Sequence, residues 1–188
     1  TAGAEVVGRS VFIVVVPFFN EEDNVEPLIR RLMPVMEAIG EAFEILVVDD
    51  GSRDRTPEVL RRLASQDSRL RVLRFARNYG QEAAVEALYL NARGRWLIQL
   101  DGDQQHPPEE IPKLIAKRDE GYDVVYGVRA KRKDAWFRVA ASNTMQWSMR
   151  SMMEIELPED VSTFRLMSAT IARLVAALPE RRKFFSAL

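Results

Sequence analysis

Hydrophobic residues along the chain follow two different spacings, which predict a regular series of strands and helices. Short continuous apolar runs are typical of strands buried on both faces in a parallel sheet. Such runs occupy residues 11–17, 43–48, 70–75, 96–100 and 123–126. Apolar residues at helical spacing fill the intervals between the runs and predict helices over 20–39, 56–66, 81–91 and 108–120.

Prolines and the later part of the chain refine this pattern. We expect Pro17 to end the first strand, and Pro27 and Pro34 to delay or kink the first helix. After Gly127 the alternation changes. A long helix is expected there, then one more strand and a final helix, at residues 136–153, 164–167 and 171–177 respectively.

Repeated strand–helix alternation predicts an α/β fold. Right-handed βαβ crossovers would build a mainly parallel, twisted sheet with helices on both faces. A chain of 188 residues is the size of one domain and is long enough to bury a core.

Composition excludes several classes of function. The formal net charge of -1 gives no overall signal for nucleic-acid binding, and none is expected. The chain contains no cysteine, which rules out disulfides, thiol catalysis and zinc–thiolate sites within it. No run reaches the roughly 18 apolar residues needed to cross a bilayer, so we expect this chain to be soluble or peripheral.

Three polar clusters each follow a predicted strand: Pro17 to Glu21, Asp49 to Thr56, and Asp101 to His106. The carboxyl ends of parallel strands lie at one edge of a sheet, where ligands bind at a topological switch point. The clusters therefore predict one binding site. The alternative for the second cluster is an Asx turn that caps the next helix, with Gly51 supplying a permissive backbone.

Asp101 and Asp103 suggest a site for Mg²⁺ or Mn²⁺. These cations prefer oxygen ligands, and Mg²⁺ often takes only one or two carboxylates, completing its shell with phosphate oxygens and water. The single histidine, His106, is either a candidate base or a turn residue ahead of two prolines. Neither a nucleophile elbow nor a glycine-rich phosphate loop is present in the sequence.

Six motifs in order carry a family resemblance: PFFNEEDN, VVDDGSRDRT, RNYGQEAA, LDGDQQHPPEEIP, VVYGVR and DVSTFRLMS. With them, nearly the whole chain resembles family-2 nucleotide-sugar glycosyltransferases of GT-A fold. It is most similar to the polyisoprenyl-phosphate glycosyltransferases. The resemblance implies transfer of a sugar, with inversion, from a nucleotide diphosphate sugar to a polyprenyl phosphate, whether undecaprenyl or dolichyl.

The resemblance also assigns the donor side of the site. It implies that Pro17, Asn20 and Glu21 begin the nucleotide pocket, and that Asp50 and Ser52 contact the base or ribose. It makes Asp103 the principal metal ligand and Gln105 a supporting one, with Asp101 near the ribose or the metal.

On the acceptor side, the resemblance implies that Arg129, Arg138, Ser142 and Arg165 receive the acceptor phosphate. Asp160 would lie beside the reacting centre, either as a base or as a group that orients an arginine or the acceptor. Relatives often carry a glycine before the Phe-Arg-Leu stretch, where this chain has Ser162 and Thr163.

Relatives in the resembling group continue into membrane helices, so residues 1–188 are expected to be a catalytic domain that works at the cytoplasmic face of a membrane. The segment 136–153 could grip the prenyl chain or be an ordinary core helix rich in methionine. Two other functions stay open: transfer to a sugar hydroxyl, and nucleotide-sugar binding without catalysis.

Overall fold

The structure, a computed structural model, describes residues 10–128 and 161–178. Its centre is a six-stranded sheet with the order β3-β2-β1-β4-β6-β5. The strands are β1 (Phe12–Phe18), β2 (Phe43–Asp49), β3 (Leu70–Arg74), β4 (Trp96–Gln99), β5 (Val124–Val128) and β6 (Val161–Ser168). The first four strands pair in parallel, and β6 runs antiparallel to both β4 and β5.

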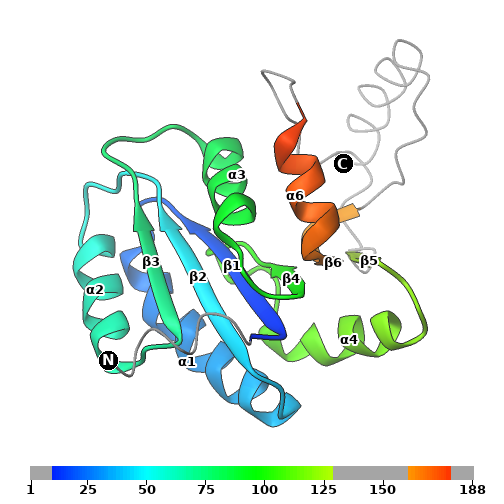
Figure 1. Cartoon of the computed structure of the whole chain (residues 1–188). Helices are drawn as coiled ribbons and strands as arrows, with labels where there is room; N and C mark the ends of the chain where they lie inside the picture. Colours follow the sequence, from blue (N-terminus) through cyan, green and yellow to red (C-terminus); the bar gives the residue numbers. More distant parts are fainter. Residues whose placement is uncertain (1–9, 129–160, 179–188) are drawn as a thin grey trace, which may run out of the picture.

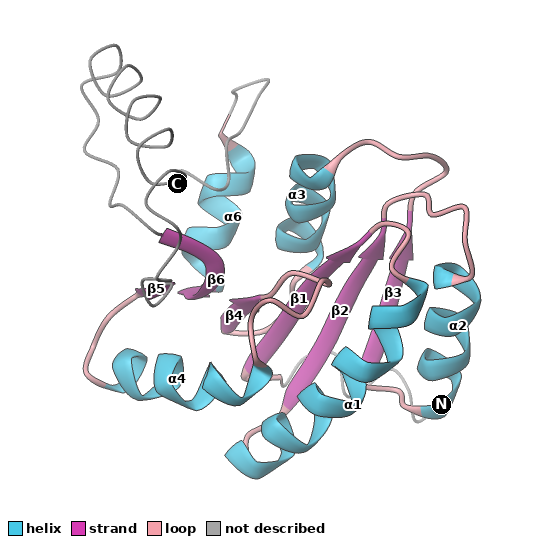
Figure 2. Cartoon of the chain, turned by 180° about the vertical axis from the view of Figure 1, so that it is seen from behind, coloured by secondary structure: helices cyan, strands magenta, loops and turns pink. Residues whose placement is uncertain are grey.

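Helices cover both faces of this sheet. They are α1 (Glu22–Ile39), α2 (Thr56–Gln66), α3 (Gln81–Asn91), α4 (Ile111–Asp119) and α6 (Ala169–Ala177), with a 3₁₀ turn, η2 (Pro108–Glu110), ahead of α4. Figure 1 is viewed from the side of α3 and α6, and Figure 2 from the side of α1, α2 and α4. The predicted α/β class, with a mainly parallel sheet between two helical layers, is confirmed.

Two hydrophobic cores follow from the alternation of side chains along β1. Phe12, Val14 and Val16 face α1, α2 and α4, whereas Ile13 and Val15 face α3 and α6. All five side chains are buried, which explains why this strand is apolar at every position rather than at alternate ones.

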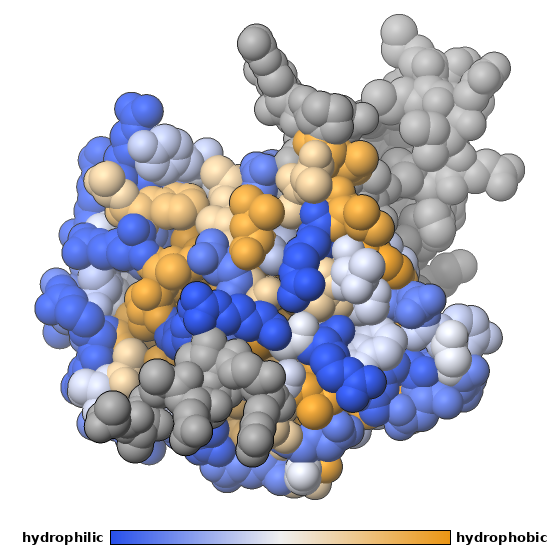
Figure 3. All heavy atoms as spheres, viewed as in Figure 1, coloured by the Kyte–Doolittle hydropathy of each residue, from blue (hydrophilic) through white to orange (hydrophobic). Residues whose placement is uncertain are grey.

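The surface over α6 is more hydrophobic than the surface over α2. Figure 3 shows hydrophobic residues over α6, where Leu174 and Leu178 are exposed, and hydrophilic residues over the side of α2. Within the described ranges, no helix combines the length and the hydrophobicity that crossing a membrane requires.

Most predicted elements appear within one or two residues of their expected bounds, but the effect of proline was wrong in two places. β1 continues through Pro17 to Phe18. The β1–β4 ladder ends at the pair Val15–Gln99, before Pro17, whereas the β1–β2 ladder continues through Pro17 to Phe18. Helix α1 begins at Glu22, ahead of both Pro27 and Pro34, so the expected late start was wrong, whereas the alternative of a kink stays a prediction.

The order of the strands creates one topological switch point. The chain moves outward from β1 to β2 and β3, and then returns to the other side of β1 with β4. The loops after β1 and β4 both lead to helices on one face, α1 and α4, whereas the loop after β3 leads to α3 on the other face. A crevice is expected between these loops at the carboxyl edge of the sheet.

Candidate active site

A cleft of about 310 Å³ opens at this switch point. Its walls come from the polar clusters that follow β1, β2 and β4, together with the start of α3. The lining residues are Pro17, Phe18, Phe19, Glu21, Asp50, Asn78, Gln81, Ala84, Asp101, Gly102 and Asp103. The predicted convergence of three strand ends is confirmed.

Hydrogen bonds between the first two clusters fix the wall next to β1. The backbone N–H of Asn20 donates to Ser52 Oγ at 2.9 Å, and Asn20 Oδ1 accepts from the N–H of Arg53 at 2.9 Å. The N–H of Glu21 donates to Thr56 Oγ1 at 2.9 Å. Asn20 has a positive φ of 54°, a conformation that asparagine tolerates better than most residues. Asn20 and Ser52 thus shape the loop that presents Glu21 to the cleft.

Asp54 strengthens the same bridge between loops. Its carboxylate accepts from the N–H of Glu22 at 3.1 Å and from the N–H of Thr56 at 3.0 Å. Burial would raise the pKa of Asp54, but hydrogen bonds from Thr56 and Glu22 outweigh it and leave the pKa below its ordinary value. The side chain is therefore a carboxylate at neutral pH.

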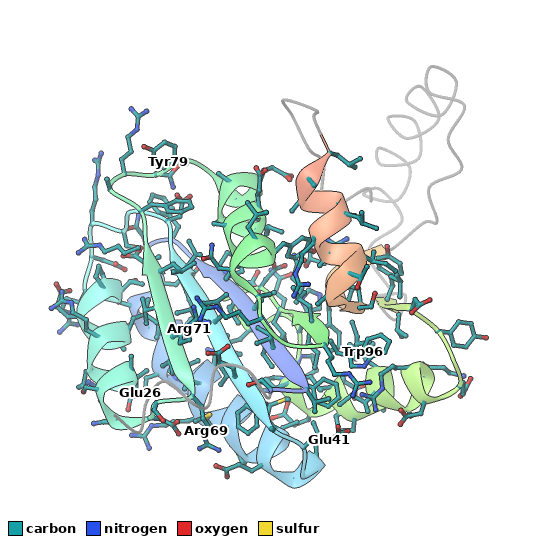
Figure 4. All side chains as sticks on the ribbon, viewed as in Figure 1. Glu26, Glu41, Arg69, Arg71, Tyr79 and Trp96 are labelled. Atoms are coloured by element: carbon teal, nitrogen blue, oxygen red, sulfur yellow. The ribbon has the colours of Figure 1, made fainter. Side chains whose placement is uncertain are left out.

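Asp50 uses both of its carboxylate oxygens to hold the loop that enters α3. Oδ1 accepts from the N–H of Tyr79 at 2.7 Å, and Oδ2 accepts from the N–H of Gly80 at 2.8 Å. Asp50 is 3% exposed, so these bonds satisfy a buried charge. Figure 4 shows Tyr79 on this loop. Asp50 therefore organises the wall of the cleft, and its contact to base or ribose stays a prediction.

The neighbouring Asp49 stabilises the loop rather than lining the cleft. One oxygen accepts from the N–H of Ser52 at 2.9 Å, which is the Asx turn considered for this cluster. The other oxygen lies 3.1 Å from Arg74 Nε, an ion pair whose angle does not meet hydrogen-bond geometry. Asp49 therefore holds the turn and Asp50 lines the cleft, but neither caps the next helix, because the N-cap residue of α2 is Arg55.

Gly51 allows this turn to pack against the next loop. It has a φ of +70°, and a Cβ placed there would lie 2.3 Å from the carbonyl carbon of Arg77 and 2.6 Å from the nitrogen of Asn78. No other residue fits both the conformation and the space without moving the wall.

Asp101 forms the wall between β4 and β6. Its Oδ2 accepts a hydrogen bond from the hydroxyl of Thr163, and its Oδ1 accepts one from Gln81 Nε2 at 3.4 Å. One carboxylate therefore joins the turn after β4 to α3 and to β6. Thr163 occupies the position where relatives often have glycine, and its hydroxyl makes this contact.

Asp103 is exposed at the mouth of the cleft. Its Oδ1 accepts from the N–H of Gln105 at 3.0 Å, which folds the turn back on itself. Gln104, with φ of 61°, connects this turn to α1 because its Nε2 donates to Asn24 Oδ1 at 2.9 Å. Gln105 is exposed and, in the part of the chain that the structure describes, lies outside the cleft lining.

The residues of the cleft suit a divalent cation whose coordination shell is completed by a bound substrate and water. Across residues 10–128 and 161–178, no group of three or more His, Cys, Asp or Glu side chains could hold a metal alone. Asp101 and Asp103 nevertheless bring two carboxylates to one cleft. Mg²⁺ usually binds to one or two carboxylates and takes its remaining ligands from phosphates and water. The donor set therefore fits a metal that binds together with a diphosphate.

His106 lies inside the fold rather than in a solvated turn. It is 6% exposed and stacks on Phe164, with ring centroids 5.7 Å apart and an interplanar angle of 16°. Its Nδ1 is 4.0 Å from Asp101 Oδ2. His106 stands in a bend ahead of the two prolines, as one of its two interpretations expected, and its imidazole is buried.

Arg165 lies on β6, opposite Gln99 of β4, and is 3% exposed. Its Nε donates to Gln99 Oε1 at 3.1 Å. Among the described residues, the cleft lining does not include it. The assignment of Arg165 to the acceptor phosphate stays a prediction. Its guanidinium is buried and bound to Gln99.

Four predicted acceptor-side residues lie outside the described residues: Arg129, Arg138, Ser142 and Asp160. The segment 136–153, proposed either to grip a prenyl chain or to pack in the core, lies outside them too. The structure thus describes the donor-side half of the predicted site.

Sequence reasoning missed three lining residues that belong to the start of α3 and the loop before it. These are Asn78, Gln81 and Ala84. The available signal was the motif RNYGQEAA, which contains all three and follows a strand in the same way as the other clusters.

Comparisons with known proteins agree with this geometry. The family model described as Glycosyl transferase family 2 matches residues 13–179. Two curated relatives each align over 93% of the chain. One is an uncharacterized glycosyltransferase of Synechocystis, 35% identical over 55% of its own length. The other is the undecaprenyl-phosphate 4-deoxy-4-formamido-L-arabinose transferase of Edwardsiella ictaluri, 36% identical over 54% of its length. The chain therefore spans about half the length of these relatives.

Solved structures support the fold. The chain superimposes on S. aureus TarS in complex with UDP with a TM-score of 0.61 at 21% identity, covering 94% of this chain and 52% of that one. Glucosyl-3-phosphoglycerate synthase of Mycobacterium tuberculosis, in complex with Mn²⁺, UDP and phosphoglyceric acid, gives 0.60 at 22% identity, covering 90% and 58%. At these identities the likeness concerns the fold alone, and the predicted GT-A fold is confirmed.

Proposed function

The chain belongs to glycosyl transferase family 2, and from this premise we propose that it transfers a sugar from a nucleotide diphosphate sugar to the phosphate of a polyprenol. The acceptor class rests on one observation, the 36% identity over 93% of the chain to a transferase that is named for undecaprenyl phosphate. The donor class is supported by the acidic cleft at the switch point.

In this proposal the nucleotide occupies the end of the cleft lined by Pro17, Glu21 and Asp50. Asn20 and Ser52 support this wall from behind through their mutual hydrogen bond. Because hydrogen bonds from backbone N–H groups to side-chain oxygens hold the two loops together, the wall can bind a nucleotide without a costly rearrangement.

The diphosphate would lie at the other end, beside Asp101 and Asp103. These two carboxylates would hold Mg²⁺ or Mn²⁺, and the exposed Asp103 would be the principal ligand. When bound, such a cation neutralises charge that develops on the departing nucleoside diphosphate. Asp101 has less freedom to move than Asp103, because Thr163 and Gln81 both donate to it.

The acceptor phosphate would attack the anomeric carbon of the sugar. An oxygen of the phosphate forms the new bond, and the bond from that carbon to the diphosphate oxygen breaks, with inversion. A phosphate monoester has a second pKa of about 6, so it is already largely dianionic at neutral pH. A strong general base is unnecessary, and we assign Asp160 to orientation of the acceptor or of an arginine.

The protein must instead bring two anions together. Planar arginine side chains suit this task because they bind phosphate through paired hydrogen bonds. We propose Arg129, Arg138 and Arg165 for it, with Ser142 as an additional donor. Since the acceptor carries a polyprenyl chain, the reaction would take place at the cytoplasmic surface of a membrane.

A donor panel tests the proposal. UDP-glucose, UDP-N-acetylglucosamine, GDP-mannose and a UDP-aminoarabinose would be mixed with Mn²⁺ and a short polyprenyl phosphate, and release of nucleoside diphosphate measured. We expect release to require both one of these donors and the lipid phosphate. Release that depends on a sugar acceptor instead would indicate transfer to a hydroxyl, and donor binding without release would indicate a binding module.

Asp103→Ala tests the metal assignment. The variant should lose transfer by about 10²-fold or more, the order expected when charge stabilisation at a leaving group is removed. Its melting temperature should be unchanged because Asp103 is exposed. Asp119→Ala, which removes another exposed carboxylate on α4, is the control and should keep full activity. Normal turnover of Asp103→Ala would refute the role of Asp103.

A further inference from the structure

A buried polar cluster lies beneath the cleft, and two of its three residues have no role in the mechanism above. It joins three elements: Tyr89 of α3, Gln99 of β4 and Arg165 of β6. Their exposed fractions are 0%, 1% and 3%. Gln99 Oε1 accepts two hydrogen bonds, one from the hydroxyl of Tyr89 and one from Arg165 Nε at 3.1 Å. Arg165 also hydrogen-bonds to the Tyr89 oxygen, which closes a triangle.

Gln99 is an exception to the apolar pattern of the buried strands. β4 is WLIQ, in which Leu97 and Ile98 are apolar and fully buried, and Gln99 is polar although it is just as buried. A buried amide is tolerated only when it is hydrogen-bonded. Gln99 meets that condition through the two donors from α3 and β6, so its position depends on both elements.

Gln99 controls the orientation of Arg165. A guanidinium is planar and carries five N–H donors in a fixed arrangement. Once Nε is bound, the plane and therefore the directions of the other four donors are largely set. Met167, the next residue on the same face of β6, is apolar and packs in the core without such a partner role.

Arg165 is also close to the cleft along the strand. Thr163 and Arg165 are two residues apart and share one face of β6, and the Thr163 hydroxyl donates to Asp101 in the cleft wall. At a rise of about 3.3 Å per residue, the backbone of Arg165 lies about 7 Å below that contact. The guanidinium that Gln99 holds lies outside the cleft lining among the described residues.

We propose that Gln99 is a positioning residue, which holds Arg165 in the orientation that receives the acceptor phosphate. Tyr89 is a second, weaker positioning residue, because it fixes the same oxygen of Gln99. The inference rests on the proposed function, in which Arg165 binds the acceptor. It assigns a role to two residues outside the donor site.

The test compares variants of the whole protein in steady-state transfer from the accepted donor to polyprenyl phosphate. Gln99→Met removes the acceptor oxygen but keeps the length of the side chain. We expect its KM for polyprenyl phosphate to rise about 10- to 100-fold, the range for loss of a hydrogen bond to a charged group. The KM for the nucleotide sugar should change less than about twofold, because no donor-site residue is altered. Tyr89→Phe should raise the acceptor KM less, by about threefold, as for one neutral hydrogen bond.

Two further variants separate positioning from simple stability. Gln99→Glu keeps an oxygen that accepts from Arg165 and should restore the acceptor KM to within about threefold of the parent, given that such bonds to charged groups are strong. Met167→Leu repacks the same face of β6 without touching the cluster and should leave both KM values unchanged.

The inference is overturned if Gln99→Met leaves the acceptor KM unchanged, or if it raises both KM values equally while lowering the melting temperature. Failure of the proposed function looks different. In that case the parent protein itself would bind the nucleotide sugar and leave polyprenyl phosphate unmodified, and the acceptor role of Arg165 would fall with it.

Discussion

Gly51→Ala is the substitution that most directly tests how the donor wall is built. The residue combines a φ of +70° with contact to the loop at Arg77 and Asn78. Directly after that contact, the N–H groups of Tyr79 and Gly80 donate to Asp50. A methyl group at position 51 would therefore push on the backbone that carries Asn78 into the cleft.

The chain contains a matched control. Gly40 has a φ of +75°, but a Cβ there would meet nothing within 4 Å. Gly40→Ala therefore measures conformational strain alone, about 1–2 kcal/mol. Gly51→Ala adds the displacement of a packed backbone, about 1–3 kcal/mol more by analogy with overpacked sites. The difference between the two variants isolates the contact with the Arg77–Asn78 backbone.

Both variants would be compared by thermal unfolding and by calorimetric titration with UDP and GDP in the presence of Mn²⁺. For a domain of 188 residues, each kcal/mol lowers the melting temperature by about 2–4 °C. We expect Gly51→Ala to melt below Gly40→Ala and to bind the nucleotide about tenfold more weakly or worse, by the usual conversion of about 1.4 kcal/mol per factor of ten. Gly40→Ala should bind normally. If the two variants are equally stable and bind equally well, the loop contact does not support the wall.

Three other carboxyl and hydroxyl groups give separate predictions. Asp50→Asn should cost about 1–3 kcal/mol in chemical denaturation, because an amide cannot accept from two N–H groups with two oxygens; unchanged stability would contradict this. The pKa of Asp54 is lowered, so its contribution to stability is present above the ordinary value of 3.8 and is lost as the pH falls below it. The difference in unfolding free energy between the parent and Asp54→Asn should therefore shrink as the pH is lowered below 3.8, and a constant difference would refute the assignment. Burial, partly opposed by Arg165, raises the pKa of Tyr89 to about 12, so stability should fall between pH 10 and 12, and Tyr89→Phe should remove the last step of a spectrophotometric alkaline titration.

The fold was predictable because its signals are local. Helix α2 and helix α3 have the bounds that apolar spacing predicts, Thr56–Gln66 and Gln81–Asn91. Proline was misjudged for a reason that lies outside the local sequence. Pro17 continues its strand because the β1–β4 ladder stops beside it, and that depends on where the distant β4 is placed.

The candidate site was predictable to the level of its strand ends but not of its contacts. Convergence of the three clusters follows from the parallel sheet, so Asp50, Asp101 and Asp103 could be brought together from the sequence. Their partners could not. The antiparallel strand β6 brings Thr163 to Asp101, and His106 turns inward to stack on Phe164. These contacts depend on the register of strands that are far apart in the chain.

The three aspartates that line the cleft, Asp50, Asp101 and Asp103, differ in how many hydrogen bonds their carboxylates already accept, and this difference suggests which of them binds the metal. Both oxygens of Asp50 accept backbone N–H groups, and both oxygens of Asp101 accept side-chain donors. Asp103 is exposed, and its Oδ1 accepts a hydrogen bond from the N–H of Gln105. A cation must displace donors from Asp101 or share its oxygens with them, whereas at Asp103 it meets an accessible oxygen. The proposed metal should therefore depend more on Asp103 than on Asp101: Asp103→Asn should weaken Mn²⁺ binding in the presence of UDP more than Asp101→Asn does, whereas Asp101→Asn should lower the melting temperature more.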